Sequence, residues 1–265
     1  MNKTIYVATA ITPGIYEDIV KIMASSFAKN NTCQLHIYCL NFTDAQYEDF
    51  CYNFGVDGNI TTHRIEYHCK YTTTNTGKYT DILDSTSCKF KIFSQSVTED
   101  YFLWLDADTL ITKNIDSITS FIKLGDIAGN PKNNYVPIHN LEYNAGVILL
   151  RNVHKEVLFN YEQYLDGLVE HNPHIQLDYA DELFMRYNYR NKAVLPTIYN
   201  SRYTNYNKTA IIQHLYGNFT PWLVSLRKMP RDARLIADMW LTEYTNIKNV
   251  LSATFTDKVD GLQYT

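Results

Sequence analysis

Two aspartates that stand two residues apart, Asp106 and Asp108, are the residues of this sequence best placed to do chemistry. They follow the apolar run 101–105 (YFLWL), which has the length and composition of a strand buried on both faces. Carboxylates in such a place need a cation or several hydrogen-bond donors, because an uncompensated buried charge is costly. If the chain turns after Asp106, both carboxylates face one point beyond the sheet edge. Hard oxygen ligands of this kind suit Mg²⁺ or Mn²⁺, whereas the alternative is a turn whose aspartates cap backbone amides.

Strand and helix patterns alternate along the half of the chain that leads to this pair. We expect strands at 4–10, 34–40, 60–67 and 101–105, and helices at 16–28, 44–53 and 81–97. In the more mixed second half we expect strands at 126–129, 145–150, 198–199 and 210–213, and helices at 155–170, 178–188 and 231–251. No linker or repeat divides the chain. The pattern predicts one α/β domain with a mostly parallel sheet, which binds ligands at the carboxyl ends of its strands.

The composition is that of a globular protein without a nucleic-acid partner. Of the 265 residues, 45% are hydrophobic and 20% are charged, which disfavours disorder and coiled coils. The 24 basic and 28 acidic residues give a net charge of −4 without a basic cluster, whereas phosphate binding needs a concentrated basic surface.

The cysteines and the first residues indicate a cytoplasmic location. The five cysteines are an odd number without a C-x-x-C pair, so we expect reduced thiols. The chain starts with a strand pattern rather than an apolar segment of signal-peptide length, and no apolar run reaches the roughly 18 residues of a membrane span. We therefore expect a cytoplasmic enzyme of bacterial or viral type with neither a signal peptide nor a transmembrane segment.

Five segments of the chain, in the right order, resemble those of the glycogenin-like, family 8 glycosyltransferases. The segment YFLWLDADTLI (101–111) resembles their D-x-D strand, and YNAGV (143–147) resembles F-N-[AS]-G-V. DYADE (178–182) is similar to D-x-x-D-Q, and LPTIYN (195–200) to L-P-x-x-Y-N. HLYG (214–217), followed by Pro221 and Trp222, resembles H-x-x-G-x-x-K-P-W. The chain is identified by this ordered set as a member of that family.

The resemblance implies a single GT-A (Rossmann-like) domain over residues 1–265, with a mixed, mostly parallel sheet flanked by helices and a C-terminal helix. Residues 1–112 would form a nucleotide-binding half, 113–230 a donor-sugar and acceptor half, and 231–265 a C-terminal helical segment. The implied activity is metal-dependent retaining transfer of glucose or galactose from a UDP-sugar to a hydroxyl of a glycan or protein-linked acceptor. The implied partners are the UDP-sugar and a saccharide acceptor, and a homodimer is left open.

The family's functional residues carry over to named positions. The metal, Mn²⁺ with Mg²⁺ as the alternative, would be held by Asp106, Asp108 and His214. Asp181 and Glu182 would be catalytic, and Asp178 would contact the acceptor. The resemblance places the following at the nucleotide or donor sugar: Ala8, Thr9, Ala10, Tyr16, Lys89, Ala107, Asn144, Ala145, Gly146 and Gly217.

Some of these roles have alternatives. Lys89 could instead lie on a solvated helix face, and Tyr16 could pack in the core. Glu182 stands where the family usually has Gln; it could be a nucleophile or a hydrogen-bond acceptor. Retention could proceed by double displacement or by front-face attack, which we favour.

One departure affects the activity itself. Thr220 stands where the family has a Lys that contacts the diphosphate. Loss of that cation removes a charge-assisted hydrogen bond worth about 1–3 kcal/mol, unless a basic residue of 227–231 replaces it. The alternative function is therefore a nucleotide-sugar-binding module with weakened or lost transfer. A nucleotidyltransferase also uses paired aspartates and a metal, but the other segments do not favour it.

Overall fold

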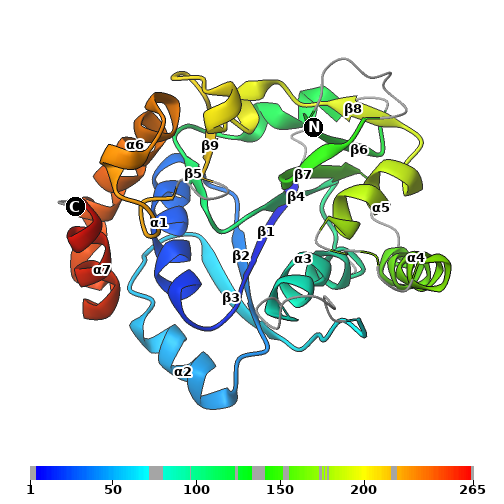
Figure 1. The fold of residues 1–265 in the computed structure, drawn as a ribbon, viewed down its shortest axis with the longest axis horizontal. Coiled ribbons are helices and arrows are strands. Elements are labelled where there is room, and N and C mark those ends of the chain that lie inside the picture. Colours follow the sequence, from blue (N-terminus) through cyan, green and yellow to red (C-terminus); the bar gives the residue numbers. More distant parts are fainter. Residues whose placement is uncertain are drawn as a thin grey trace.

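A mixed sheet of seven strands, in the order β3-β2-β1-β4-β7-β6-β8, runs through the middle of the molecule (Figure 1). This computed structural model describes residues 4–71, 80–95, 97–122, 125–132, 141–151, 155–172, 175, 177, 179–215 and 220–263. The strands of the sheet are β1 (Ile5–Ile11), β2 (Leu35–Leu40), β3 (Ile60–Ile65), β4 (Tyr101–Leu105), β6 (Ile127–Pro131), β7 (Tyr143–Arg151) and β8 (Lys192–Val194). Because β7 is antiparallel to both β4 and β6 while the other pairings are parallel, β7 alone runs against the rest.

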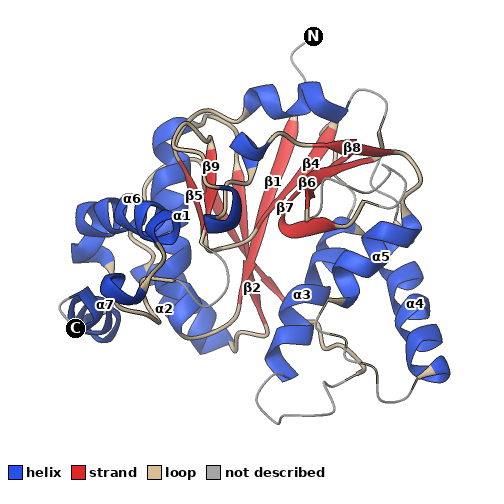
Figure 2. Cartoon of the chain, turned by 45° about the horizontal axis from the view of Figure 1, so that its top comes forward, coloured by secondary structure: helices blue, strands red, loops and turns tan. Residues whose placement is uncertain are grey.

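Helices cover both faces of this sheet (Figure 2). They are α1 (Ile15–Asn30), α2 (Asp44–Asn53), α3 (Thr80–Phe93), α4 (Val157–His171), α5 (Ala180–Asn188), α6 (Arg231–Ile247) and α7 (Ala253–Gln263). One hydrophobic core joins the sheet to α1 and α2, and a second joins it to α3, α4 and α5. A third cluster packs α6 and α7 against the outer side of α1. The described fold is thus the mixed, helix-flanked α/β domain that the sequence predicts.

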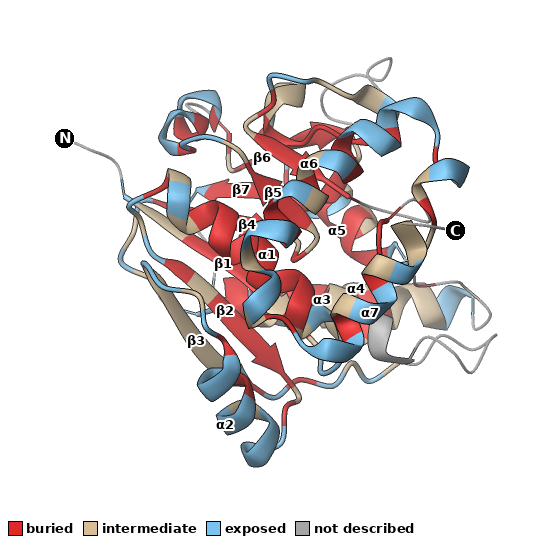
Figure 3. Cartoon of the chain, turned by 90° about the vertical axis from the view of Figure 1, so that its left-hand side faces the viewer, coloured by how far each residue is buried: buried red, intermediate tan, exposed pale blue. Residues whose placement is uncertain are grey.

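Strand β4 explains why the apolar run before the aspartates is continuous. Tyr101, Leu103 and Leu105 face the first core, while Phe102 and Trp104 face the second. Side chains alternate across a strand, so a strand covered on both faces must be apolar at every position. Figure 3 shows this central part of the sheet buried between the helices. The strand therefore delivers Asp106 from the middle of the core to the sheet edge.

The structure corrects several expected elements. The expected strand 198–199 is wrong: the segment is a 3₁₀ helix, Thr197–Tyr199, in which the Tyr199 amide donates to the Pro196 carbonyl instead of to a strand. The expected C-terminal helix 231–251 is confirmed as α6, which continues into a 3₁₀ turn, Lys248–Val250. The separate helix α7 follows it, and the Ser252 hydroxyl accepts a hydrogen bond from the Phe255 amide at its start. Strand β8 and the short strand β5 (Thr109–Ile111) have no counterpart among the expected elements.

Two other expectations concern the thiols and the membrane. All five cysteines are free, as expected. Within the described part of the chain, none of the helices has both the length and the apolar composition that a bilayer crossing requires.

Candidate functional site

A tight turn at the carboxyl end of β4 presents Asp106 and Asp108 to the same space. The amide and the hydroxyl of Thr109 both donate to the Asp106 carbonyl, at 3.1 and 2.8 Å, and close the turn. The Asp106 amide donates to the carbonyl of Gly146 on β7 at 2.8 Å, which fixes the turn to the sheet. The turn is therefore held by hydrogen bonds to backbone carbonyls, none of which uses a carboxylate oxygen of Asp106 or Asp108.

A second, two-stranded sheet brings His214 to this turn. Strand β5, which follows Asp108, pairs antiparallel with β9 (Ile212–His214), and Thr109 lies opposite His214. The Leu215 amide donates to the Asp108 carbonyl at 3.0 Å and extends the pairing. The His214 Nε2 atom lies 3.2 Å from Asp108 Oδ1 and 3.9 Å from Asp106 Oδ2. The structure therefore brings the three expected metal ligands together, with one ligand atom from each within 4.8 Å of the others.

The imidazole of His214 is fixed in the orientation that a metal ligand needs. Its Nδ1 atom is 3.1 Å from the Asn200 side-chain oxygen, to which it donates, and the Asn200 amide donates to Asn144 Oδ1 at 2.9 Å. A donating Nδ1 leaves the lone pair of Nε2 directed at the carboxylates, the arrangement that outer hydrogen bonds impose on ligating histidines. Asn200 is fully buried. The sequence did not predict that Asn200 orients His214, although Asn200 is the last residue of the LPTIYN segment.

Gly146 leaves the space that the His214 ring fills. A Cβ atom at this position would lie 2.0 Å from His214 Cε1 and 2.7 Å from Nδ1. Such overlap would force the buried ring out of place. The close approach of the β7 backbone therefore depends on glycine here, on the side of the site where the resemblance expects a small residue.

The electrostatics of Asp106, Asp108 and His214 favour a cation at this site. Burial raises the pKa of Asp106 above its ordinary value and Asp108 raises it further, while Lys89 and His214 oppose this. Burial alone would lower the pKa of His214, but Asp108 and Asp106 raise it above its ordinary value. Two carboxylates and a neutral imidazole are the oxygen and nitrogen donors that Mn²⁺ and Mg²⁺ sites use. The residues present therefore fit a divalent cation, which would replace the proton that they otherwise hold.

Lys89 and Asp181 form a buried ion pair at the side of the pocket. The Lys89 Nζ atom is 2.6 Å from Asp181 Oδ2, and the two side chains are only 3% and 4% exposed. Lys89 also lies 5.6 Å from the ring centroid of Trp104, whose indole N–H donates to Asp106 Oδ1 at 2.7 Å. Lys89 is thus no solvated surface residue: it links Asp181 to the side chains around the metal ligands.

Glu182 is buried beside Asp181 and is paired with a lysine that sequence reasoning missed. Lys132 forms ion pairs with Glu182 and, at 3.2 Å, with Glu142, and its Nζ atom is 4.6 Å from the centroid of the Tyr179 ring. The Ala145 amide donates to Glu182 Oε1 at 3.2 Å. Burial and the Asp181 charge raise the pKa of Glu182 to about 7, and Lys132 opposes them. Lys132 directly follows β6, but the expected strand ended at 129, so no sequence signal indicated this lysine.

A cavity of about 450 Å³ lies at the carboxyl ends of β1 and β4 and at the amino end of the antiparallel β7. Most of the expected site residues line it: Ala10, Tyr16, Lys89, Asp106, Ala107, Asp108, Asn144, Ala145, Gly146, Asp181, Glu182 and His214. Ala8 and Thr9 do not, because both are fully buried inside β1. Asp178 and Gly217 lie outside the described residues. Lining residues that the sequence did not indicate are Ile11, Thr12, Pro13, Ile15, Ser85, Thr86, Trp104 and Tyr179.

Tyr16 faces this cavity rather than the core. Its side chain is 42% exposed, and it lines the pocket together with Asp106 and Asp108. Burial and the two aspartates raise the pKa of Tyr16 to about 12, so its hydroxyl stays protonated at neutral pH. The ring is thus available for contact with a ligand.

No basic residue of 227–231 takes the place of the lysine that Thr220 replaces. Arg227, Lys228 and Arg231 are exposed and lie outside the described pocket lining, in which Lys89 alone is a lysine or arginine. Thr220 itself is 2% exposed.

Comparison with known proteins supports the fold. No protein-family model and no curated protein sequence matches the chain. The galactosyltransferase LgtC, solved with donor and acceptor sugar analogues, matches with a TM-score of 0.65 at 15% identity, over 95% of this chain and 99% of that one. The bifunctional glycosyltransferase WbbM matches with a TM-score of 0.60 at 13% identity, over 92% of this chain and 52% of that one. The glycosyltransferase GlyE of Streptococcus pneumoniae TIGR4 matches with a TM-score of 0.57 at 16% identity, over 93% of this chain and 65% of that one. The chain therefore has the fold of a single GT-A glycosyltransferase domain.

Proposed function

We propose that this protein is a retaining glycosyltransferase that moves a hexose, glucose or galactose, from a UDP-sugar to a hydroxyl of a glycan or protein-linked acceptor. The observation that carries the proposal is the cluster of Asp106, Asp108 and His214 at the edge of a GT-A sheet, in a pocket of about 450 Å³. This volume lies in the range of small-molecule sites, about 300–1,000 Å³. The donor set suits Mn²⁺, with Mg²⁺ as the alternative.

The charge balance of the site supports a divalent cation. Four carboxylates and two ammonium groups stand in or against the pocket: Asp106, Asp108, Asp181, Glu182, Lys89 and Lys132. With Glu182 ionised and His214 neutral, a divalent ion offsets the excess of negative charge. When bound, such an ion supplies a Lewis acid that stabilises the charge of the departing diphosphate.

The chain's own residues supply binding and orientation. In the proposed complex Tyr16 and Ala10 contact the uridine, and the Asn144–Gly146 backbone lies against the donor sugar. Lys89 holds the Asp181 carboxylate in one orientation through the 2.6 Å contact, so this carboxylate can accept hydrogen bonds from sugar hydroxyls without a conformational search.

Glu182 is the second carboxylate that faces the sugar. Lys132 and the Ala145 amide both stabilise its ionised form, in which it stabilises positive charge on the donor sugar. We favour front-face attack, in which the leaving diphosphate helps to deprotonate the acceptor. Double displacement with Glu182 as nucleophile is the alternative.

Donor hydrolysis tests this proposal. We expect UDP release from UDP-glucose or UDP-galactose with Mn²⁺, with the α configuration retained in the released sugar by NMR. Release should stop with EDTA and in Asp108→Asn, which keeps the shape of the side chain but removes its charge. Full activity of folded Asp108→Asn would contradict the metal assignment.

A nucleotide-sugar-binding module is the second candidate, and the surroundings of Thr220 favour it. No described basic residue of 227–231 reaches the pocket, so the diphosphate would be bound with one cation fewer than the family pattern implies. Binding of a UDP-sugar by calorimetry without release of UDP or transfer to any acceptor would support this function instead.

A further inference from the structure

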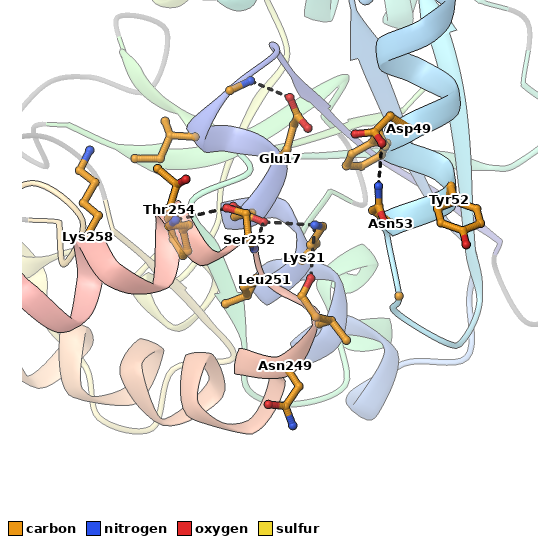
Figure 4. Close-up of a pocket in the computed structure, with 17 residues that line it drawn as sticks. Glu17, Lys21, Asp49, Tyr52, Asn53, Asn249, Leu251, Ser252, Thr254 and Lys258 are labelled. Atoms are coloured by element: carbon orange, nitrogen blue, oxygen red, sulfur yellow. Dashed lines mark hydrogen bonds and ion pairs between the residues drawn. The ribbon is translucent and has the colours of Figure 1, made fainter.

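A second cavity, of about 730 Å³, adjoins the catalytic pocket across the first turn of α1. It lies between the start of α1, the end of α2 and the segment that leads into α7 (Figure 4). Ile15 lines both cavities, and its neighbours divide between them: Tyr16 lines the catalytic pocket, while Gly14 and Glu17 line the second cavity. The second cavity is therefore next to the proposed reaction site but contains none of its metal ligands.

The buried charges of this cavity serve to attach α7 to α1. Lys21 Nζ is 3.1 Å from Asp18 Oδ1, and the two side chains are each 8% exposed. The Ser252 hydroxyl donates to Asp18 Oδ2 at 2.5 Å, and Lys21 donates to the Val250 carbonyl at 3.4 Å (Figure 4). Because these groups bind one another, neither Asp18 nor Lys21 offers an uncompensated charge to a ligand.

The walls combine apolar surface with hydrogen-bonding groups. Apolar side chains from all three segments line the cavity: Ile15, Phe50, Val250, Leu251 and Phe255. Tyr52, on α2, is 89% exposed and stands at the cavity edge. Asp49 and Asn53 lie on the same helix, 2.8 Å apart between Asn53 Nδ2 and Asp49 Oδ1. A ligand that suits this lining has apolar faces and many hydroxyl groups.

The charge of the lining disfavours an anionic ligand. Beside the Asp18–Lys21 pair, the cavity holds the carboxylates of Glu17 and Asp49 and the ammonium group of Lys258. Negative charges thus exceed positive ones, which disfavours a phosphate, a nucleotide or an anionic lipid. A neutral oligosaccharide suits this cavity because it carries no charge and combines apolar and hydrogen-bonding surface. Its ring faces carry C–H groups that stack on aromatic rings, and its edges carry hydroxyls.

We propose that this cavity is a second saccharide-binding site that holds a neutral oligosaccharide outside the catalytic pocket. In this site Tyr52 stacks on a sugar ring, and Asp49, Asn53 and Glu17 accept or donate hydrogen bonds to hydroxyls. The inference rests on the proposed function, for which it supplies an anchor: a glycan held here has a raised effective concentration at the adjacent reaction site.

Binding of neutral tetrasaccharides tests the site without catalysis. Maltotetraose, cellotetraose and laminaritetraose are titrated into the full chain in EDTA without nucleotide, and saturation-transfer NMR gives the Kd. We expect at least one of them to bind and Tyr52→Ala to weaken it about tenfold, the order expected for a central aromatic contact. Thr254→Trp, which fills the cavity from its exposed edge, should weaken it as much. Tyr187→Ala, which removes another exposed tyrosine that lies outside the cavity, should leave the Kd unchanged.

The results separate this inference from the proposed function. The saccharide site would be overturned if none of the tetrasaccharides binds, or if Tyr52→Ala and Thr254→Trp bind them as tightly as wild type does. It would also be overturned if tetra-alanine binds at this cavity as tightly as the tetrasaccharides. UDP release without acceptor should be the same in wild type and all three variants, because none of them changes the catalytic pocket. Tyr52-dependent tetrasaccharide binding with no UDP release from any UDP-sugar would instead leave this site standing and refute the proposed transfer.

Discussion

Replacing Gly146 by Ala should damage the metal site through a single methyl group. The new Cβ would lie 2.0 Å from His214 Cε1, more than 1 Å inside any normal contact, so the ring must move and its hydrogen bond to Asn200 at 3.1 Å must break. Loss of an outer hydrogen bond of a ligating histidine typically lowers metal affinity about 10–100-fold. We therefore expect Gly146→Ala to raise the Kd for Mn²⁺ by at least about tenfold, or about 1.4 kcal/mol, in calorimetric titrations.

Two other glycines separate this effect from general damage. Gly129→Ala places a Cβ 2.7 Å from Tyr143 Cγ, so it should cost about 1–3 kcal/mol of stability as overpacking but leave Mn²⁺ affinity unchanged. Gly167→Ala, on α4, meets no atom within 4 Å and should stabilise the protein by about 0.5–1 kcal/mol. Unfolding in urea gives these stabilities. If folded Gly146→Ala binds Mn²⁺ as tightly as wild type, the assignment of His214 as a ligand is refuted.

Three further predictions concern the charges of the site. The two aspartates raise the pKa of His214 above its ordinary value, so protons compete with the metal for this side chain. Mn²⁺ affinity should therefore fall as the pH drops through that raised pKa. Calorimetry that shows constant affinity from pH 8 to pH 5 would contradict this. In the pH profile of UDP release, Lys132→Met should move the acid limb upward by about one pH unit. The reason is that Glu182, with a pKa of about 7, loses a charge-assisted hydrogen bond. The acid limb should vanish in Lys132→Met/Glu182→Gln. Lys89→Met leaves Asp181 buried without its partner and should lower the free energy of unfolding, measured in urea, by about 3–5 kcal/mol. Lys91→Met, at a partly exposed position of the same helix, should lower it by under about 1 kcal/mol. Equal losses of stability in the two variants would refute the contribution of the buried pair.

The part of the site that sequence could predict is the part encoded by continuous segments. The apolar run of β4 is unambiguous because both of its faces are buried, and Asp106 and Asp108 follow it directly. Their proximity to His214 depends on the pairing of β5 with β9, two strands of three residues each. Strands this short have no readable period, so the motif resemblance rather than the pattern placed His214 at the metal.

The contacts that sequence reasoning missed join distant segments. Lys132 reaches Glu182 from fifty residues away, and only the packing of α5 beside β7 brings them together. Asn200 meets His214 because Ser201 pairs with Gln213 in an isolated bridge. Helix α7, which follows the expected helix 231–251, is a related case: the Ser252 hydroxyl that caps its start also donates to Asp18, a residue of α1. Local pattern carries no information about such partners.

The most direct test of the central claim is the position of manganese in crystals grown with Mn²⁺ and UDP, read from anomalous scattering. We expect one strong peak within coordination distance, about 2.0–2.3 Å, of Asp106, Asp108 and the Nε2 atom of His214, and its loss in Asp108→Asn. A peak elsewhere, or an unchanged peak in Asp108→Asn, would refute the assignment of these three residues as metal ligands.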